Sequence, residues 1–366
     1  MEPLKNMYNH QFVSYLAQAI HAEHAAFDNA AFTETVFDDD WEHLELKGRM
    51  RHISRSMHAH LPGSYPEAIA ILSGASNRLA QYTFERIIFS DFVEVYGLDD
   101  LETSIPAMEL FTQQCTSEFA VRPFILQDCE RMMAQMLQWA THDNVHVRRL
   151  ASEGCRPRLP WAMSLPMFKT DPTPILPILE KLRFDRENYV RKSVANNLND
   201  IAKDNPQVTL EIARRWSANE KPGWIVKHAL RTLVKAGDPT ALEILGFSPT
   251  PHIALDNLTV SASSVAIGGE LEFSFDVISN SDTPQSLMID YVVYLFKKNG
   301  AHSEKVFKLS QRDIGPGEHL TLRRKQSFRP VSTRKYYAGP HAIEIQINGQ
   351  RAGKVEFQLT DEEYHG

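Results

Sequence analysis

A short pattern occurs three times between residues 139 and 235 of this 366-residue chain. The sequence VRRLA at 147–151 is followed by VRKSV at 190–194 and, more loosely, by VKHAL at 226–230, at separations of 43 and 36 residues. An aliphatic residue, two basic or potentially basic residues and an apolar continuation are typical of the second helix of an α-helical repeat. Such repeats stack helix pairs into a curved solenoid with a concave binding face. The pattern therefore predicts an α-solenoid.

The periodicity of the apolar residues changes near residue 250. From residue 10 to about 247 they recur at spacings of three and four, as in residues 128–139, which is typical of helices. Further on, Leu271, Phe273 and Phe275 alternate with polar residues, the two-residue period of a half-buried strand. Six or seven such segments, separated by turn signals, fill the last 105 or so residues. This spacing is typical of an immunoglobulin-like β-sandwich.

The sequence thus predicts a mainly α protein with two domains. We expect a HEAT-like α-solenoid over residues 1–250 and a C-terminal immunoglobulin-like β-sandwich domain over residues 251–366.

Cysteine usage and hydropathy indicate the compartment. The three cysteines form no CxxC pair, and the N-terminal sequence lacks the basic start and uninterrupted apolar centre of a signal peptide. No apolar run approaches the roughly 20 residues that span a bilayer. We expect a cytoplasmic protein in a bacterium, associated with the nucleoid, monomeric and without a membrane partner.

The charge is distributed unevenly along the chain. The formal net charge is −7, but residues 139–236 contain 17 Lys and Arg against 10 Asp and Glu. A basic face on an otherwise acidic protein can concentrate a polyanion at one place. Ordinary solvated faces of charged helices would give the same composition, so the charge alone leaves both interpretations open.

Two carboxylates lie on the helices that carry the repeated basic residues. Lys192 and Asp200 fall on one polar stripe of their helix, and Arg149 and Glu153 form the corresponding i, i+4 stripe in the preceding repeat. A structural reading is also open, because Arg149 and Glu153 could form an ordinary surface ion pair and Asp200 could only pair with Lys203.

The segment GCRPRLPW at residues 154–161 follows the first of these helices. Its two prolines end the helix and are expected to present Arg156, Arg158 and Trp161 on a rigid loop. A tryptophan beside carboxylates and arginines is suited to a cationic aromatic group against a phosphate backbone. A tryptophan after a proline is, alternatively, often a core anchor.

Other catalytic signatures are missing from the sequence. There is no GxSxG, Walker or GxGxxG motif, and the histidines and cysteines do not form a zinc-binding set. We expect neither a metal nor another cofactor.

The two longer motifs resemble a known family. VRRLASEGCRPRLPW at 147–161 and YVRKSVANNLND at 189–200 are similar to the HEAT-like DNA alkylation repair glycosylases, and in particular to their AlkC branch, some members of which carry an immunoglobulin-like domain. The resemblance implies removal of 3-methyladenine and 3-methylcytosine from double-stranded DNA, without extrusion of the base. It also implies that the acids of the two motifs are Glu153 and Asp200, that the tryptophan is Trp161, and that Glu118 is a further acid facing the substrate.

Six basic residues are the expected contacts to the DNA phosphates: Arg148, Arg149, Arg156, Arg158, Lys192 and Lys227. A different function class stays open, since most HEAT solenoids are scaffolds that bind a protein or nucleic acid without catalysis. Formation of abasic sites in methylated DNA would discriminate between the two, because a scaffold forms none.

Overall fold

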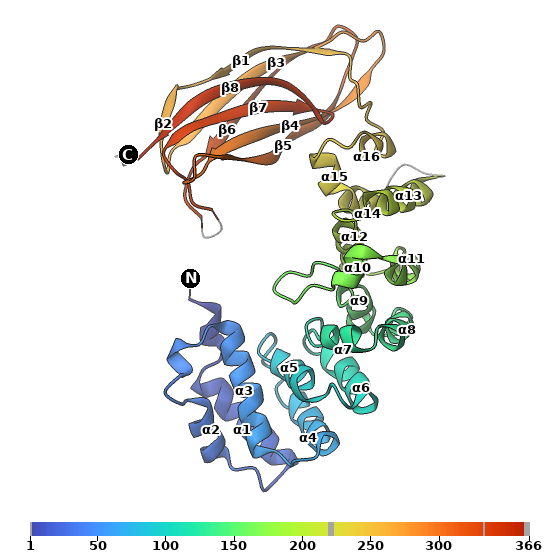
Figure 1. The fold of residues 1–366 in the computed structure, drawn as a ribbon, viewed down its shortest axis with the longest axis vertical. Helices are drawn as coiled ribbons and strands as arrows, with labels where there is room; N and C mark the ends of the chain where they lie inside the picture. Colours follow the sequence, from blue (N-terminus) through green and yellow to red (C-terminus); the bar gives the residue numbers. More distant parts are fainter. Residues whose placement is uncertain (1, 219–222, 332–333, 362–366) are drawn as a thin grey trace. The chain divides into compact units, whose positions relative to one another are not determined.

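The computed structural model describes residues 2–218, 223–331 and 334–361. Contacts divide the chain into two compact units, Met1–Asn205 and Pro206–Gly366, and each is described here by itself. Figure 1 labels the elements of both. No helix in the described ranges is long and apolar enough to cross a membrane.

The first unit is entirely helical. Its α-helices are α1 (His10–Glu23), α2 (Asn29–Val36), α3 (Leu46–His60), α4 (Tyr65–Asn77), α5 (Ile87–Tyr96), α6 (Leu101–Thr112), α7 (Val121–Gln127), α8 (Cys129–Trp139), α9 (Val145–Glu153), α10 (Pro166–Thr170), α11 (Leu176–Leu182) and α12 (Asn188–Ile201). Asx caps start many of them: Asn9, Asp28, Asp100, Asp128 and Asn144 each accept a hydrogen bond from the first turn. These caps and the buried apolar stripes account for the succession of short helices.

The second unit begins with four helices and ends with eight strands. The helices are α13 (Pro206–Ser217), α14 (Trp224–Ala229), α15 (Arg231–Lys235) and α16 (Pro239–Ile244). The strands are β1 (Ile253–Val260), β2 (Ser264–Ala266), β3 (Glu270–Ser279), β4 (Gln285–Phe296), β5 (His302–Ile314), β6 (His319–Ser327), β7 (Gly339–Ile347) and β8 (Gln350–Thr360).

The strands form two sheets, in the orders β1-β3-β6 and β2-β8-β7-β4-β5 (Figure 1). The predicted alternation in β3 is confirmed, since Leu271, Phe273 and Phe275 are buried in the core between the sheets. Tyr291 and Ile343 enter the same core from β4 and β7. A helical region followed by an immunoglobulin-like sandwich is therefore the observed architecture, as the sequence predicts.

The compact units do not divide near residue 250. The change from helix to strand falls there, but α13–α16 belong with the sandwich. Gln346 donates to the Lys235 carbonyl at 3.3 Å, and Asn348 donates to the Ser248 carbonyl at 2.8 Å. The backbones of Gly237 and Gly349 touch so closely that a Cβ on Gly349 would lie 2.5 Å from the Gly237 Cα. The change of secondary structure near residue 250 and the division into compact units therefore fall at different places, and the domain boundary at residue 250 stays a prediction.

Candidate active site

Helices α9 and α12 carry the two repeated motifs and pack against each other. Val147 and Leu150 of α9, like Val190 and Val194 of α12, are completely buried. These aliphatic residues supply the apolar stripes, so the polar residues between them are free to face elsewhere on each helix.

A buried polar seam joins the two helices. The Ser152 hydroxyl donates to the Ser193 hydroxyl at 2.7 Å, and Asn197 donates to the Ser152 carbonyl at 2.8 Å. Ser193 in turn donates to Glu153 Oε2 at 2.6 Å. The seam fixes one oxygen of Glu153 relative to α12.

Six charged side chains of alternating sign continue from this seam, and we call them the charged row. Its members are, in spatial order, Glu118, Arg149, Glu153, Arg156, Asp200 and Lys203. All three acids that the family resemblance implies are therefore brought together, from three separate segments of the first unit.

Arg156 is the centre of the charged row. Its Nη1 donates to Glu153 Oε1 at 2.7 Å, and its Nη2 lies 2.8 Å from Asp200 Oδ2. The second oxygen of Asp200 accepts from Lys203 at 2.9 Å. One guanidinium thus binds the acids of both repeats and offsets the repulsion between these two like charges.

The residues that form these pairs are nearly buried. Asp200 is 1% exposed, Glu153 5% and Arg156 7%. Burial pulls the pKa of Arg156 down, but the charges of Glu153 and Asp200 outweigh it and raise the pKa above its ordinary value. The arginine therefore stays charged and holds two nearly buried carboxylates.

Glu118 lies at the other end of the charged row, beside a hollow. Arg149 Nη1 donates to Glu118 Oε2 at 2.5 Å, and Arg149 Nη2 lies 3.4 Å from Glu153 Oε1. The Arg149 guanidinium also lies over the Tyr189 ring, 5.1 Å from its centroid. Glu118, Arg149, Tyr189 and His146 line a hollow of about 390 Å³. The hollow offers aromatic surface next to an acid.

The loop between α9 and α10 is held from inside the protein. Arg122, which is completely buried, donates to the carbonyls of Gly154 and Arg156 at 2.8 Å each and to that of Met163 at 2.7 Å. Burial lowers the pKa of Arg122 to about 10. Gly154 allows this close packing, because a Cβ there would lie 2.7 Å from Val121 Cγ1.

Trp161 lies on this loop, which is the green loop beside α10 in Figure 1. Its side chain is not a core anchor, because the residue is 66% exposed. Its φ is +64°, in the left-handed region that bulky residues seldom adopt. Strain of this kind costs about 1–3 kcal/mol and clusters at functional sites.

The predicted phosphate contacts fall into three groups. Arg148 is buried and pairs with Asp185 at 2.6 Å, and Arg156 is buried and pairs with acids of the charged row. The burial and pairing of these two arginines favour a structural role over contact with phosphate. Arg149 is likewise committed to Glu118 and Glu153. Arg158 is partly exposed and pairs with Asp204, whereas Lys192 and, in the second unit, Lys227 are exposed.

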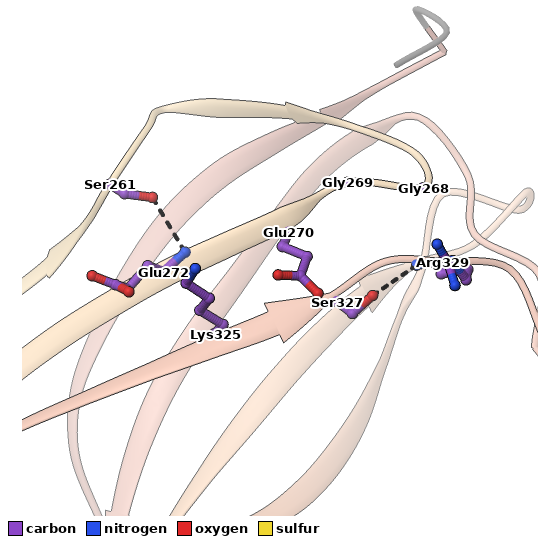
Figure 2. A pocket seen from close by; sticks show the side chains of 8 residues that line it. All are labelled: Ser261, Gly268, Gly269, Glu270, Glu272, Lys325, Ser327 and Arg329. Atoms are coloured by element: carbon purple, nitrogen blue, oxygen red, sulfur yellow. Dashed lines mark hydrogen bonds between the residues drawn. The ribbon is translucent and has the colours of Figure 1, made fainter. Parts of the chain in front are cut away.

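A hollow of about 670 Å³ on the sandwich has a different chemistry (Figure 2). Figure 2 shows Glu270 and Glu272 of β3 beside Lys325 of β6, with Arg329 just beyond that strand. The two carboxylates offset the charge of the two cations, so the hollow offers no net positive charge to a polyanion. In the described ranges, no cluster of three or more His, Cys, Asp or Glu side chains is arranged to hold a metal ion.

Several residues of the site were not anticipated from the sequence. Ser193 and Asn197 lie inside the motif at 189–200, but their roles depend on tertiary contacts that the motif does not reveal, and the same holds for Arg122. Tyr189 opens the motif at 189–200, and its aromatic ring near the start of α12 is a signal that could have drawn attention to it.

Comparison with known proteins places these features in a family. A family model described as DNA alkylation repair enzyme matches residues 114–233, and a model of the C-terminal Ig-like domain of the uncharacterised protein YhaZ matches residues 254–361. Uncharacterized protein YhaZ of Bacillus subtilis is 44% identical, over 98% of this chain and all of that protein. The solved structure of Pseudomonas fluorescens alkylpurine DNA glycosylase AlkC, bound to DNA containing an abasic site analog, matches with a TM-score of 0.93. It is 37% identical, over 98% of this chain and all of that one.

Proposed function

Because the chain belongs to the AlkC branch of the DNA alkylation repair enzymes, we propose that it is a DNA glycosylase. Its substrates are cationic 3-methylated bases in double-stranded DNA, 3-methyladenine and 3-methylcytosine. It hydrolyses the N-glycosidic bond without extruding the base from the stack. The observation that carries the proposal is the charged row, in which ion pairs with two arginines join three carboxylates from separate segments, and the loop that follows α9 carries an exposed tryptophan.

The chemistry of the lesion explains why carboxylates suffice. A base methylated at the 3-position is already cationic, so it is a good leaving group and needs no proton from the enzyme. Positive charge develops on the deoxyribose as the bond breaks, and carboxylates stabilise such oxocarbenium-like sugars in glycoside hydrolysis. Fixed charges in a water-poor site act without reorganising at the moment of reaction.

The residues of the site divide these tasks. Glu153 and Asp200 supply the negative charge opposite the sugar and position the water, while Glu118 supplies a further negative charge beside the hollow. Arg156 and Arg149 lie between the three acids and form an ion pair with each of them. The exposed Trp161 indole packs against the lesion nucleotide and excludes bulk water.

Exposed cations contribute the affinity for DNA. Lys192, Lys227 and Arg158 are suited to phosphates, because their side chains reach solvent. Arg148, Arg149 and Arg156 act mainly through the carboxylates that they hold.

Release of free methylated base by the purified protein tests the function. Asp200→Asn keeps the shape but removes the charge, and should slow single-turnover release by roughly ten- to a thousandfold, as loss of one electrostatic stabiliser does. Glu153→Gln should act in the same direction. The affinity for DNA should change little, since removal of an anion does not weaken binding to phosphates.

Two outcomes would contradict the proposal. If the parent protein releases no base from methylated duplex DNA and forms no abasic sites, it is a non-catalytic scaffold. If both amide variants release base at the parent rate, the acids are not the catalytic groups.

A further inference from the structure

Lys47 and Trp161 are 114 residues apart in the sequence but meet in the first unit. Lys47 lies in the first turn of α3, and its Nζ donates a hydrogen bond to the carbonyl oxygen of Trp161. The same ammonium lies over the ring of Phe119, 4.6 Å from its centroid. Phe119 directly follows Glu118, so one cation joins the tryptophan loop to the segment that begins the charged row.

The carbonyl that Lys47 binds belongs to the strained residue itself. Arg122 fixes the loop at Gly154, Arg156 and Met163, on either side of Trp161. A left-handed backbone at a bulky residue persists only where surrounding contacts hold it. Within the described part of the chain, the hydrogen bond from Lys47 is such a contact.

We propose that Lys47 is a positioning residue, which holds the backbone of Trp161 and thereby the direction of its exposed indole. The role rests on the proposed glycosylase function, in which Trp161 packs against the lesion nucleotide. Small displacements matter in such a site, because misplacement of a reacting group by about 1 Å can cost a hundredfold in rate. Lys47 acts through Trp161 and needs no contact with the substrate.

A different role for Lys47 has different consequences. Its side chain is exposed, so it could bind a DNA phosphate directly. A phosphate contact adds to affinity and to its salt dependence, whereas a positioning contact adds to the rate of the bound complex.

The test compares single-turnover base release at saturating enzyme with the Kd for the same methylated duplex. Lys47→Gln should slow release about three- to thirtyfold and change the Kd by less than about twofold. Lys47→Arg keeps a charged donor and should recover most of the rate. Lys181→Gln removes the same charge from an exposed position on α11 and should leave the rate unchanged.

A double-mutant cycle identifies the partner. If Lys47 acts through Trp161, then Lys47→Gln should add little to the defect of Trp161→Ala. If the fold-loss of rate in the double variant equals the product of the fold-losses in the two single variants, the inference is overturned. A weaker Kd with an unchanged saturated rate would also overturn it, because Lys47 would then be a phosphate contact.

The position of the indole can be measured without catalysis. The fluorescence emission of Trp161 is obtained by subtracting the emission spectrum of the Trp161→Phe variant from that of the same protein with Trp161. Lys47→Gln should shift this difference and change its quenching by acrylamide, while Lys181→Gln should not. An unchanged difference would overturn the inference even if the parent released no base, so its failure and that of the proposed function are distinguishable.

Discussion

Two arginines of one loop show how burial affects the contribution of an ion pair to the stability of the protein. Arg156 binds Glu153 and Asp200, and all three side chains are less than a tenth exposed. Arg158 binds Asp204 through two hydrogen bonds, but its side chain is 40% exposed. Solvent screens the second pair and not the first, so the two should differ in their effect on stability.

Arg156→Gln should lower the free energy of unfolding by about 3 kcal/mol, because it leaves two buried carboxylates without their shared cation. Arg158→Gln should lower it by less than about 1 kcal/mol. Urea denaturation of both variants beside the parent measures the difference. Equal losses would show that the charged row contributes no more than a surface pair.

The buried polar seam between α9 and α12 connects two helices through their side-chain hydroxyls. Ser193 accepts from Ser152 and donates to Glu153, so it links helix packing to the orientation of an acid that we propose to be catalytic. Ser193→Ala removes the donor to a charged, buried acceptor and should cost about 1–3 kcal/mol of stability. Ser152→Ala removes only a neutral hydroxyl from the same seam and should cost less. Thermal unfolding of the two variants compares them, and a larger loss for Ser152→Ala would contradict this view of the seam.

In the second unit, strand β4 carries a buried carboxylate. Burial raises the pKa of Asp290 to about 6, although Lys308 and Lys235 act in the opposite direction. Because the folded-state pKa is raised, this group's contribution to stability is fully present below about pH 4 and is lost as the pH rises through about 6.

Asp290→Asn should therefore make the protein less sensitive to pH. Between pH 5 and pH 7.5 the parent should lose about 1 kcal/mol of stability through this residue, and the variant should not. Urea denaturation at the two pH values checks this, with Asp313→Asn on β5 as the control for removal of an exposed carboxylate. Parallel pH profiles for Asp290→Asn and the parent would rule out this titration.

At the scale of the whole molecule, four of the 17 basic residues in residues 139–236 are less available to DNA than their count suggests. Arg148, Arg149, Arg156 and Arg158 all bind carboxylates of the chain itself. Only cations that reach phosphates release counterions, and each changes the slope of log K against log salt by about −0.9 on duplex DNA.

The affinity for duplex DNA should weaken as salt rises, with fewer phosphate contacts than the segment has basic residues. Lys192→Gln should make the slope shallower by about one, because this side chain is exposed. Arg148→Gln should instead lower stability and leave the slope nearly unchanged, since its partner is Asp185. Titrations between low and moderate salt measure both slopes, and an affinity that does not respond to salt would contradict the binding mode.

The sequence alone determined the properties that depend on local periodicity. Apolar residues recur every three or four positions before residue 250 and every two positions after it, which marked the change from helices to the sandwich. The repeated pattern placed Glu153 and Asp200 on polar stripes of two helices. The tertiary structure decided which charges meet. Arg156 and Asp200 are 44 residues apart, and their pairing depends on how α9 and α12 pack. The grouping of α13–α16 with the sandwich and the contact of Lys47 with Trp161 are of the same kind. Periodicity fixes which face of an element is apolar, but the register and angle of packing between distant elements fix which polar groups are buried together.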